Sequence, residues 1–211
     1  MKEFWDKYDK KRINELPVVS FGGRIIVVQS EAEADKAVRY LLAQPILGFD
    51  TETRPSFRPG PMNPVALLQV ATQDTCFLFR LCNMGLPDSV VRLLSDREVL
   101  KVALSWRDDI GQLQRRRRFR AGDFFELQEH VKEFGIEDLS LQKIFANVFG
   151  QKISKSQQLT NWEADALTEK QKLYAATDAW ACLRLYEELK QLKQTGEWKL
   201  LKHEELISTE K

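Results

Sequence analysis

The sequence predicts a single α/β domain. Short apolar runs with the length and composition of strands occur between residues 25 and 127, and nearly everything after residue 129 follows a helical period. A chain of 211 residues has the size of one domain, and a hydrophobic fraction of 43% allows a sizeable core. Strands first and helices later, with no convincing linker between them, indicate one mixed domain.

The strands are expected where apolar, β-branched or aromatic residues cluster between turn signals. These segments are residues 25–28, 46–53, 65–72, 75–81, 100–104 and 123–127. A tight turn at Gln73 and Asp74 makes the segments on either side of it neighbours in an antiparallel meander with 46–53. The 100–104 run is short and mostly apolar, which is typical of a buried strand.

The helices are expected at residues 31–43, 87–95, 107–118, 129–134, 140–149 and 168–193. Ser30 is a good N-cap for the first of them, because acidic residues follow it in the first turn. Residues 1–20 are expected to form an N-terminal arm or short helix that Pro17 ends, and residues 21–195 the folded domain. Residues 196–211 are expected to be a charged, weakly held C-terminal tail.

Composition excludes several function classes. With 32 basic and 31 acidic residues, net charge indicates no partner. Three cysteines without metal-ligand spacing, and only two histidines, argue against a disulfide framework, a zinc site or a histidine triad. The N-terminus lacks signal-peptide order and no apolar stretch approaches the ~18 residues of a spanning helix. A soluble protein of a reducing, cytoplasmic compartment, without membrane contact, is expected.

The segment Gly48–Thr53 carries the first candidate site. On a strand, Asp50 and Glu52 share one face, because side chains alternate between faces. Two close carboxylates repel unless a positive group neutralises them, and hard divalent cations prefer oxygen ligands. The alternative is a strand end with two solvated acids, and this segment alone does not decide between them.

Two later segments supply further acids. Asp108 and Asp109 follow a buried strand at a helix start, where acids are also favoured by the helix dipole alone. Asp178 lies inside an alanine-rich helix, a costly place for a charge without a partner. Tyr174, four residues earlier, shares its helical face. The alternative for this helix is close packing through alanine, with Asp178 bonded locally.

Taken in order, these motifs resemble the DEDD superfamily of 3′→5′ exonucleases in its tyrosine-bearing branch, of the ribonuclease D and Werner-syndrome helicase exonuclease type. The resemblance spans about residues 25–192 and includes the run 65–70, Ser140-Leu141 and the segment from Asn161 to Ala179. The family pattern places the second ligand eight residues after Lys101, which selects Asp109 and leaves Asp108 on the surface. The resemblance implies a ribonuclease H-like fold with a mixed five-stranded sheet flanked by helices. Residues 21–195 would then be the exonuclease domain.

The resemblance also implies a mechanism. Two divalent cations, Mg²⁺ or Mn²⁺, would assist hydrolysis of phosphodiester bonds from a free 3′ end of DNA or RNA and release nucleoside monophosphates. Tyr174 would orient the attacking water, and the backbone of Thr51 and Glu52 would contact the 3′ nucleotide. The implied metal ligands, which are also the catalytic acids, are Asp50, Glu52, Asp109 and Asp178.

Basic residues give a weaker indication of substrate contact. Lys155 and Lys152 could bind phosphates, and so could the run 115–118 with Arg120, although basic residues at a helix end are usually solvated. The preference for DNA or RNA stays open, and helper proteins are expected to act in trans. The alternatives are a catalytically silent nucleic-acid-binding or scaffold protein of the same fold, and an unrelated α/β interaction module.

Overall fold

The central feature of the computed structural model, which describes residues 1–57 and 62–203, is a six-stranded mixed sheet. Its strands, in the order β2-β5-β4-β3-β6-β7, are β2 (Arg24–Val28), β5 (Thr75–Arg80), β4 (Val65–Ala71), β3 (Ile46–Thr53), β6 (Leu100–Ala103) and β7 (Phe124–Glu126). β4 runs antiparallel to both of its neighbours, and the other pairings are parallel. The predicted α/β class is therefore confirmed. The sheet has six strands and not five, because β2 adds to the free edge of β5.

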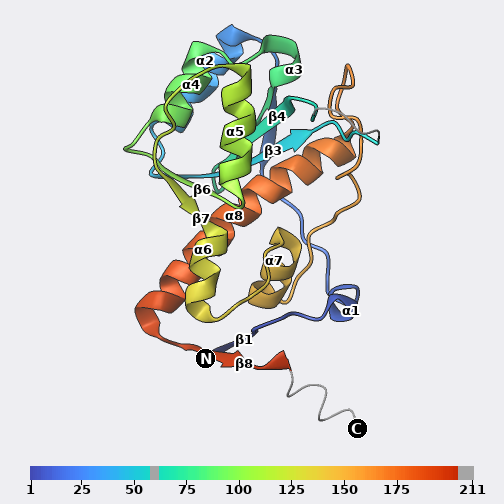
Figure 1. The fold of residues 1–211 in the computed structure, drawn as a ribbon, viewed down its shortest axis with the longest axis vertical. Coiled ribbons are helices and arrows are strands. Elements are labelled where there is room, and N and C mark those ends of the chain that lie inside the picture. The colour runs from blue at the N-terminus through green and yellow to red at the C-terminus, as the bar shows by residue number, and fades with distance from the viewer. Residues whose placement is uncertain (58–61, 204–211) are drawn as a thin grey trace.

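Helices cover both faces of this sheet (Figure 1). One face packs against α2 (Glu31–Leu41), α4 (Asp88–Ser95) and α5 (Trp106–Arg116). The long helix α8 (Glu169–Thr195) crosses the other face. Beside α8 lie α6 (Leu127–Val131), the 3₁₀ turn Lys132–Phe134 and α7 (Leu141–Phe149), and a single turn, α3 (Leu81–Met84), follows β5.

The helix boundaries follow the capping residues. The Ser30 hydroxyl accepts from the Glu33 N–H, and the Glu33 carboxylate accepts from the Ser30 N–H, which closes a capping box at the start of α2. Thr168 and Gln171 form the same reciprocal pair at the start of α8. This capping box fixes the residue at which α8 begins.

The two ends of the chain pair with each other. β1 (Lys2–Trp5) runs parallel to β8 (Trp198–Leu201) in a separate two-stranded sheet. The N-terminal arm, which also contains the short helix α1 (Lys10–Ile13), is therefore partly a strand, and the expectation of a weakly held tail is wrong for residues 198–201. The pairing was missed because each strand is short and charged and its partner lies at the other end of the chain. The rest of the predicted tail, residues 204–211, lies outside the described residues, as do residues 58–61.

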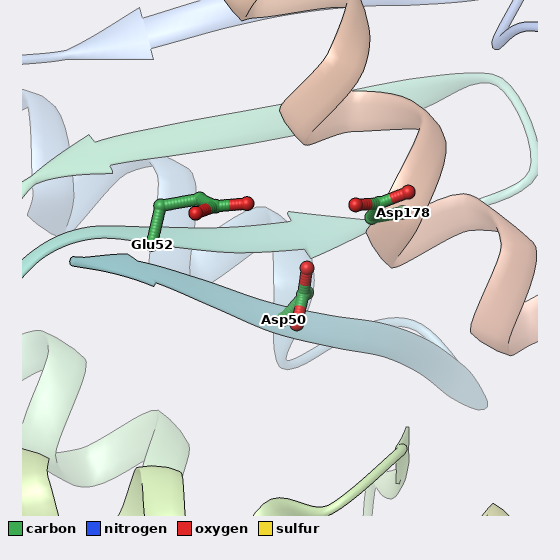
Figure 2. A group of neighbouring side chains, drawn as sticks. All are labelled: Asp50, Glu52 and Asp178. Carbon is green, nitrogen blue, oxygen red and sulfur yellow. The ribbon is translucent and has the colours of Figure 1, made fainter. Parts of the chain in front are cut away.

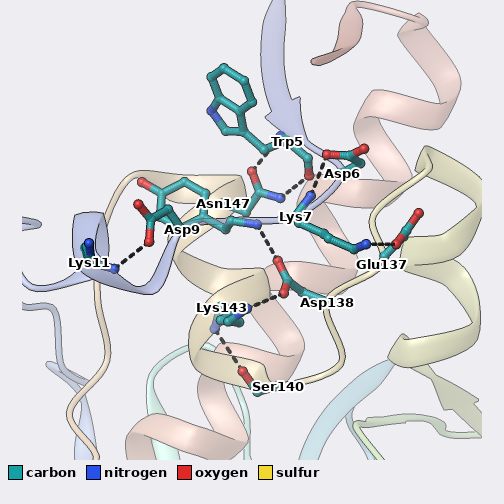
Figure 3. Close-up of polar contacts among 11 residues, drawn as sticks. Trp5, Asp6, Lys7, Asp9, Lys11, Glu137, Asp138, Ser140, Lys143 and Asn147 are labelled. Carbon is teal, nitrogen blue, oxygen red and sulfur yellow. Dashed lines mark hydrogen bonds and ion pairs between the residues drawn. The ribbon is translucent and has the colours of Figure 1, made fainter. Parts of the chain in front are cut away.

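The N-terminal arm also holds α7 in place (Figure 3). The Asn147 side chain bonds both the N–H and the carbonyl of Trp5, at 2.9 and 2.7 Å. The buried Asp138 carboxylate accepts from the Tyr8 N–H at 2.7 Å and from Lys143 Nζ at 2.8 Å. The contacts of Asn147 hold the C-terminal half of α7, and those of Asp138 hold its N-terminal end at Ser140 and Leu141, which border a pocket.

Two further observations concern the described part of the chain. None of its helices is both long and apolar enough to cross a bilayer. Cys76, Cys82 and Cys182 carry free thiols.

Candidate active site

Three carboxylates converge where α8 crosses β3 (Figure 2). Asp50 and Glu52 leave the same face of β3, and Asp178 reaches toward them from α8. One oxygen from each lies within 4.8 Å of the other two. The structure therefore brings together residues from the first and third predicted motifs.

This approach depends on small residues at the crossing. A Cβ on Gly48 would lie 2.1 Å from the carbonyl oxygen of Ala179, far inside van der Waals contact. Ala175, Ala176 and Ala179 are fully buried on the same side of the helix. Because no side chain separates the two backbones here, Asp178 can reach the acids of β3.

Negative charge outweighs positive charge at this site, where Lys155 faces three carboxylates. Burial raises the pKa of Asp50 well above its ordinary value, and the charges of Asp178 and Glu52 raise it further. Burial, followed by the charges of Asp178 and Asp109, raises the pKa of Glu52 to about 9. Burial also raises the pKa of Asp178, to about 7, although a hydrogen bond from Tyr174 and the charge of Lys155 act in the other direction. A group of carboxylates that resists ionisation in this way would bind a cation favourably.

The fourth predicted acid, Asp109, lies beside this group and not within it. It lies in the first turn of α5, where its Oδ1 accepts a hydrogen bond from Thr51 Oγ1 at 2.6 Å. Burial raises the pKa of Asp109 to about 6, and the bond from Thr51 opposes that shift. Its neighbour Asp108 is exposed, as the motif spacing predicted.

The turn from β6 into α5 sets the position of Asp109. Ser105 adopts a left-handed conformation with φ of 60°, which is uncommon for a residue other than glycine. The Glu126 carboxylate, from β7, accepts the N–H groups of Ser105 and Trp106 at 2.8 and 2.7 Å. This carboxylate holds the first turn of α5 and therefore the direction of Asp109.

Tyr174 lies one turn before Asp178 on the same face of α8, and its hydroxyl bonds the Asp178 carboxylate. Its ring lies against Trp162, with the centroids 5.9 Å apart. Burial and the nearby carboxylates raise the pKa of Tyr174 further above its ordinary value, so the phenol stays protonated.

Comparison with known proteins identifies the family. A family model described as 3′-5′ exonuclease matches residues 25–193. The chain belongs to this family of 3′-5′ exonucleases. Its members are hydrolases, and membership implies the use of divalent metal ions.

Individual relatives agree. The chain is 31% identical over 195 residues to the bifunctional 3′-5′ exonuclease/ATP-dependent helicase WRN of Mus musculus, covering 87% of this chain but 14% of that protein. It is 29% identical over 197 residues to a 3′-5′ exonuclease of Arabidopsis thaliana, covering 86% and 68%. The crystal structure of the Aedes aegypti Nibbler EXO domain superposes with a TM-score of 0.71 at 26% identity, covering 81% of this chain and 89% of that one.

In this exonuclease family member the acids open onto a pocket of about 250 Å³. Besides Asp50, Glu52, Asp178 and Tyr174, predicted substrate contacts Thr51 and Lys155 line it. The other lining residues, to which the sequence alone assigns no role, are Leu104, Ser140, Leu141, Gln142, Ile153, Ser154, Gln158 and Cys182. Ser140 and Leu141 could have been found, because they belong to the family pattern. The sequence around them does not indicate that α7 begins at the pocket.

The other basic candidates lie elsewhere. Lys152 Nζ bonds the carbonyl oxygen of Asn14 in the N-terminal arm. Arg116 Nε bonds the carbonyl oxygen of Val65 at 2.8 Å, and Arg117 pairs with Asp88. These three side chains are not among the described residues that line the pocket.

Proposed function

We propose that this chain hydrolyses phosphodiester bonds stepwise from the 3′ end of a nucleic acid and releases nucleoside monophosphates. The observation that carries the proposal is the convergence of Asp50, Glu52 and Asp178 in one pocket, in a chain of the 3′-5′ exonuclease family. All four acids and the tyrosine of the family pattern are present, which favours an active enzyme over a silent scaffold.

The donor set fits divalent cations. Its ligand atoms are carboxylate oxygens, which Mg²⁺ and Mn²⁺ prefer, and burial together with the neighbouring carboxylates raises the pKa values of Asp50 and Glu52, which a bound cation would lower. Asp50, Glu52 and Asp178 would hold one cation directly, and Asp109 would contribute to a second. Two such cations would stabilise the charge on the attacking and leaving oxygens and acidify the attacking water.

The remaining residues would position the substrate. Tyr174 would orient the attacking water through its hydroxyl, because a protonated phenol can donate and accept hydrogen bonds. Lys155, which faces the pocket near Asp178, would bind a phosphate. The backbone of Thr51 and Glu52 would contact the terminal nucleotide.

A labelled oligonucleotide tests the proposal directly. The 5′-labelled strand should shorten from its 3′ end in the presence of Mg²⁺, and a 3′-blocked strand should resist. Asp178→Asn and Asp50→Ala should lower the rate by at least ~10³-fold, because each removes a charged metal ligand. Asp108→Asn, which changes an exposed acid next to Asp109, is the matched control and should keep full activity. Full activity in Asp178→Asn would disprove the assigned site, and an inactive wild type would favour the silent scaffold.

Tyr174→Phe separates orientation of water from metal binding. Removing only the hydroxyl should slow cleavage ~10–100-fold, because one positioned hydrogen bond is lost. The Mn²⁺ concentration that gives half of the full rise in melting temperature should stay unchanged. Equal loss of cleavage and metal binding would contradict the separate role of Tyr174.

Substrate choice and partners are further parts of the proposal. The chain spans 14% of the mouse helicase and 68% of the Arabidopsis exonuclease, so the activities of those whole proteins do not transfer to it. Matched DNA and RNA strands, single-stranded and recessed, would establish the preferred nucleic acid, and addition of cell extract would reveal helper proteins in trans. A cytoplasmic location stays a prediction from the cysteine content.

A further inference from the structure

Gln69 is an unusual residue in the core of this protein. Its side chain is fully buried, at 0% exposure, in the middle of β4. Both its amide nitrogen and its amide oxygen lack a hydrogen-bond partner among the described residues. Buried polar groups are nearly always paired, and leaving one unpaired costs free energy. An orphaned amide of this kind therefore requires an explanation.

The strand register places this amide beside the candidate active site. Gln69 lies directly opposite Asp50 in the antiparallel pairing of β3 with β4. Residues opposite each other in such a pair project from the same face of the sheet, with Cβ atoms about 4.5–5.5 Å apart. Gln69 and Asp50 are therefore neighbours on the face that α8 covers.

The nearest neighbours of Gln69 in β4 and β5 are apolar. Its partner in register on the other side, in β5, is Leu78. The residues two positions away on its own strand are Leu67 and Ala71, and all three belong to the apolar cluster under α8. On the facing strand β3, Glu52 lies diagonally across from Gln69, whereas Asp50 lies directly opposite it, so the Asp50 carboxylate is the acceptor nearest in register to the Gln69 amide.

We propose that Gln69 is a positioning residue that donates an amide hydrogen to Asp50 and holds that carboxylate in the orientation that binds the cation. This inference rests on the proposed function, because it assigns a cation to Asp50. A carboxylate bound to a metal is normally fixed by a second hydrogen bond from the protein, and loss of that bond weakens metal binding or activity about 10–100-fold. A cation at Asp50 would ionise and orient that carboxylate and so give the Gln69 amide an acceptor.

Replacing Gln69 should have opposite effects on the stability of the metal-free protein and on the binding of metal. Gln69→Met keeps the length of the side chain and removes the amide. In metal-free protein the variant should melt at the same temperature as wild type or higher, because an unpaired buried group has been removed. With metal, the Mn²⁺ concentration that gives half of the full rise in melting temperature should increase ~10–100-fold. A residue with only a packing role would give the reverse pattern, with lower metal-free stability and unchanged metal binding.

Ser89→Ala is the matched control. Ser89 is also buried with an unpaired side-chain oxygen, but it lies on α4, which packs against the other face of the sheet. Its removal should leave the Mn²⁺ midpoint unchanged. If wild type melts at the same temperature with and without Mn²⁺, the proposed function fails and this inference fails with it. If wild type responds and Gln69→Met has the same midpoint, only this inference fails.

A second measurement covers the case in which Gln69→Met does not fold. In wild-type protein labelled with ¹⁵N-glutamine, the side-chain amide signal of Gln69 should move when Mg²⁺ is added, and its hydrogens should exchange more slowly with solvent. An amide signal that neither moves nor gains protection would overturn the proposal.

Discussion

Gly48→Ala tests whether the crossing of α8 over β3 controls the active site. The added Cβ would lie 2.1 Å from the Ala179 carbonyl oxygen, whereas ordinary contact begins at 3.4 Å. The helix must therefore move away by about 1.3 Å, the difference between these two distances, because the atom in the way belongs to the backbone. Asp178 is the residue before Ala179, so it should move with the helix.

The expected losses follow from this displacement. Overpacking of a buried contact costs about 1–3 kcal/mol, which lowers the melting temperature by roughly 2–12 °C in a chain of this size. A shift of about 1 Å in a catalytic group can reduce the rate ~10²-fold. Melting is followed by circular dichroism, and cleavage of the 5′-labelled strand is measured well below the melting temperature.

Gly111→Ala is the control for this experiment. Gly111 lies within α5, and a Cβ there would meet no atom within 4 Å. Alanine is favoured over glycine inside a helix by about 1 kcal/mol, so this variant should be as stable as wild type or more stable, with unchanged cleavage. If Gly48→Ala folds and cleaves at the wild-type rate, the close approach of α8 to β3 does not determine the position of Asp178 in the site.

Two other perturbations probe the electrostatics and the fourth acid. Thr51→Val should lower the cleavage rate ~10–100-fold, because the 2.6 Å hydrogen bond to Asp109 is lost. Thr51→Ser keeps the hydroxyl and should keep most of the rate. Equal rates for the two variants would contradict the role of this hydrogen bond in positioning Asp109. In metal-free protein the raised pKa values of Glu52, about 9, and Asp178, about 7, mean that the folded state retains protons that the unfolded chain releases above about pH 4. Stability from these groups is therefore present at low pH and is lost as the pH rises through 7 and 9. Melting curves in EDTA should show this decline and saturating Mn²⁺ should reduce it; a metal-free protein that gains stability over the same range would show the opposite sign.

The sequence contained enough to predict the main sheet and the residues at its centre. Strand alternation put Asp50 and Glu52 on one face, and helical spacing put Tyr174 and Asp178 on one face. Their convergence was not available from either pattern, because it depends on how closely α8 approaches β3. Gly48 allows that approach, but a glycine before an acidic strand end does not by itself indicate a helix crossing.

Contacts distant in sequence account for what was missed. Asp109 was selected by a family spacing, whereas its actual support comes from Thr51 and from Glu126 of β7, which no local pattern connects to it. Gln69 was part of a run interpreted as a strand and as part of the family pattern, but it received no role, since its position opposite Asp50 depends on the register. The β1–β8 pairing joins residues at the two ends of the chain, beyond the reach of any local period.

That terminal pairing has a consequence for synthesis on the ribosome. β1 precedes every strand of the main sheet in the chain, yet its partner, Trp198–Leu201, follows every acid of the candidate site and the whole of α8. Because domains tend to fold as the chain emerges, the main sheet can assemble around α8 while β1 still lacks its neighbour. β1 would thus be translated before the main sheet and would pair only after that sheet has formed. A released chain that ends before residue 198 should already protect the main sheet from protease while leaving residues 2–5 open to it.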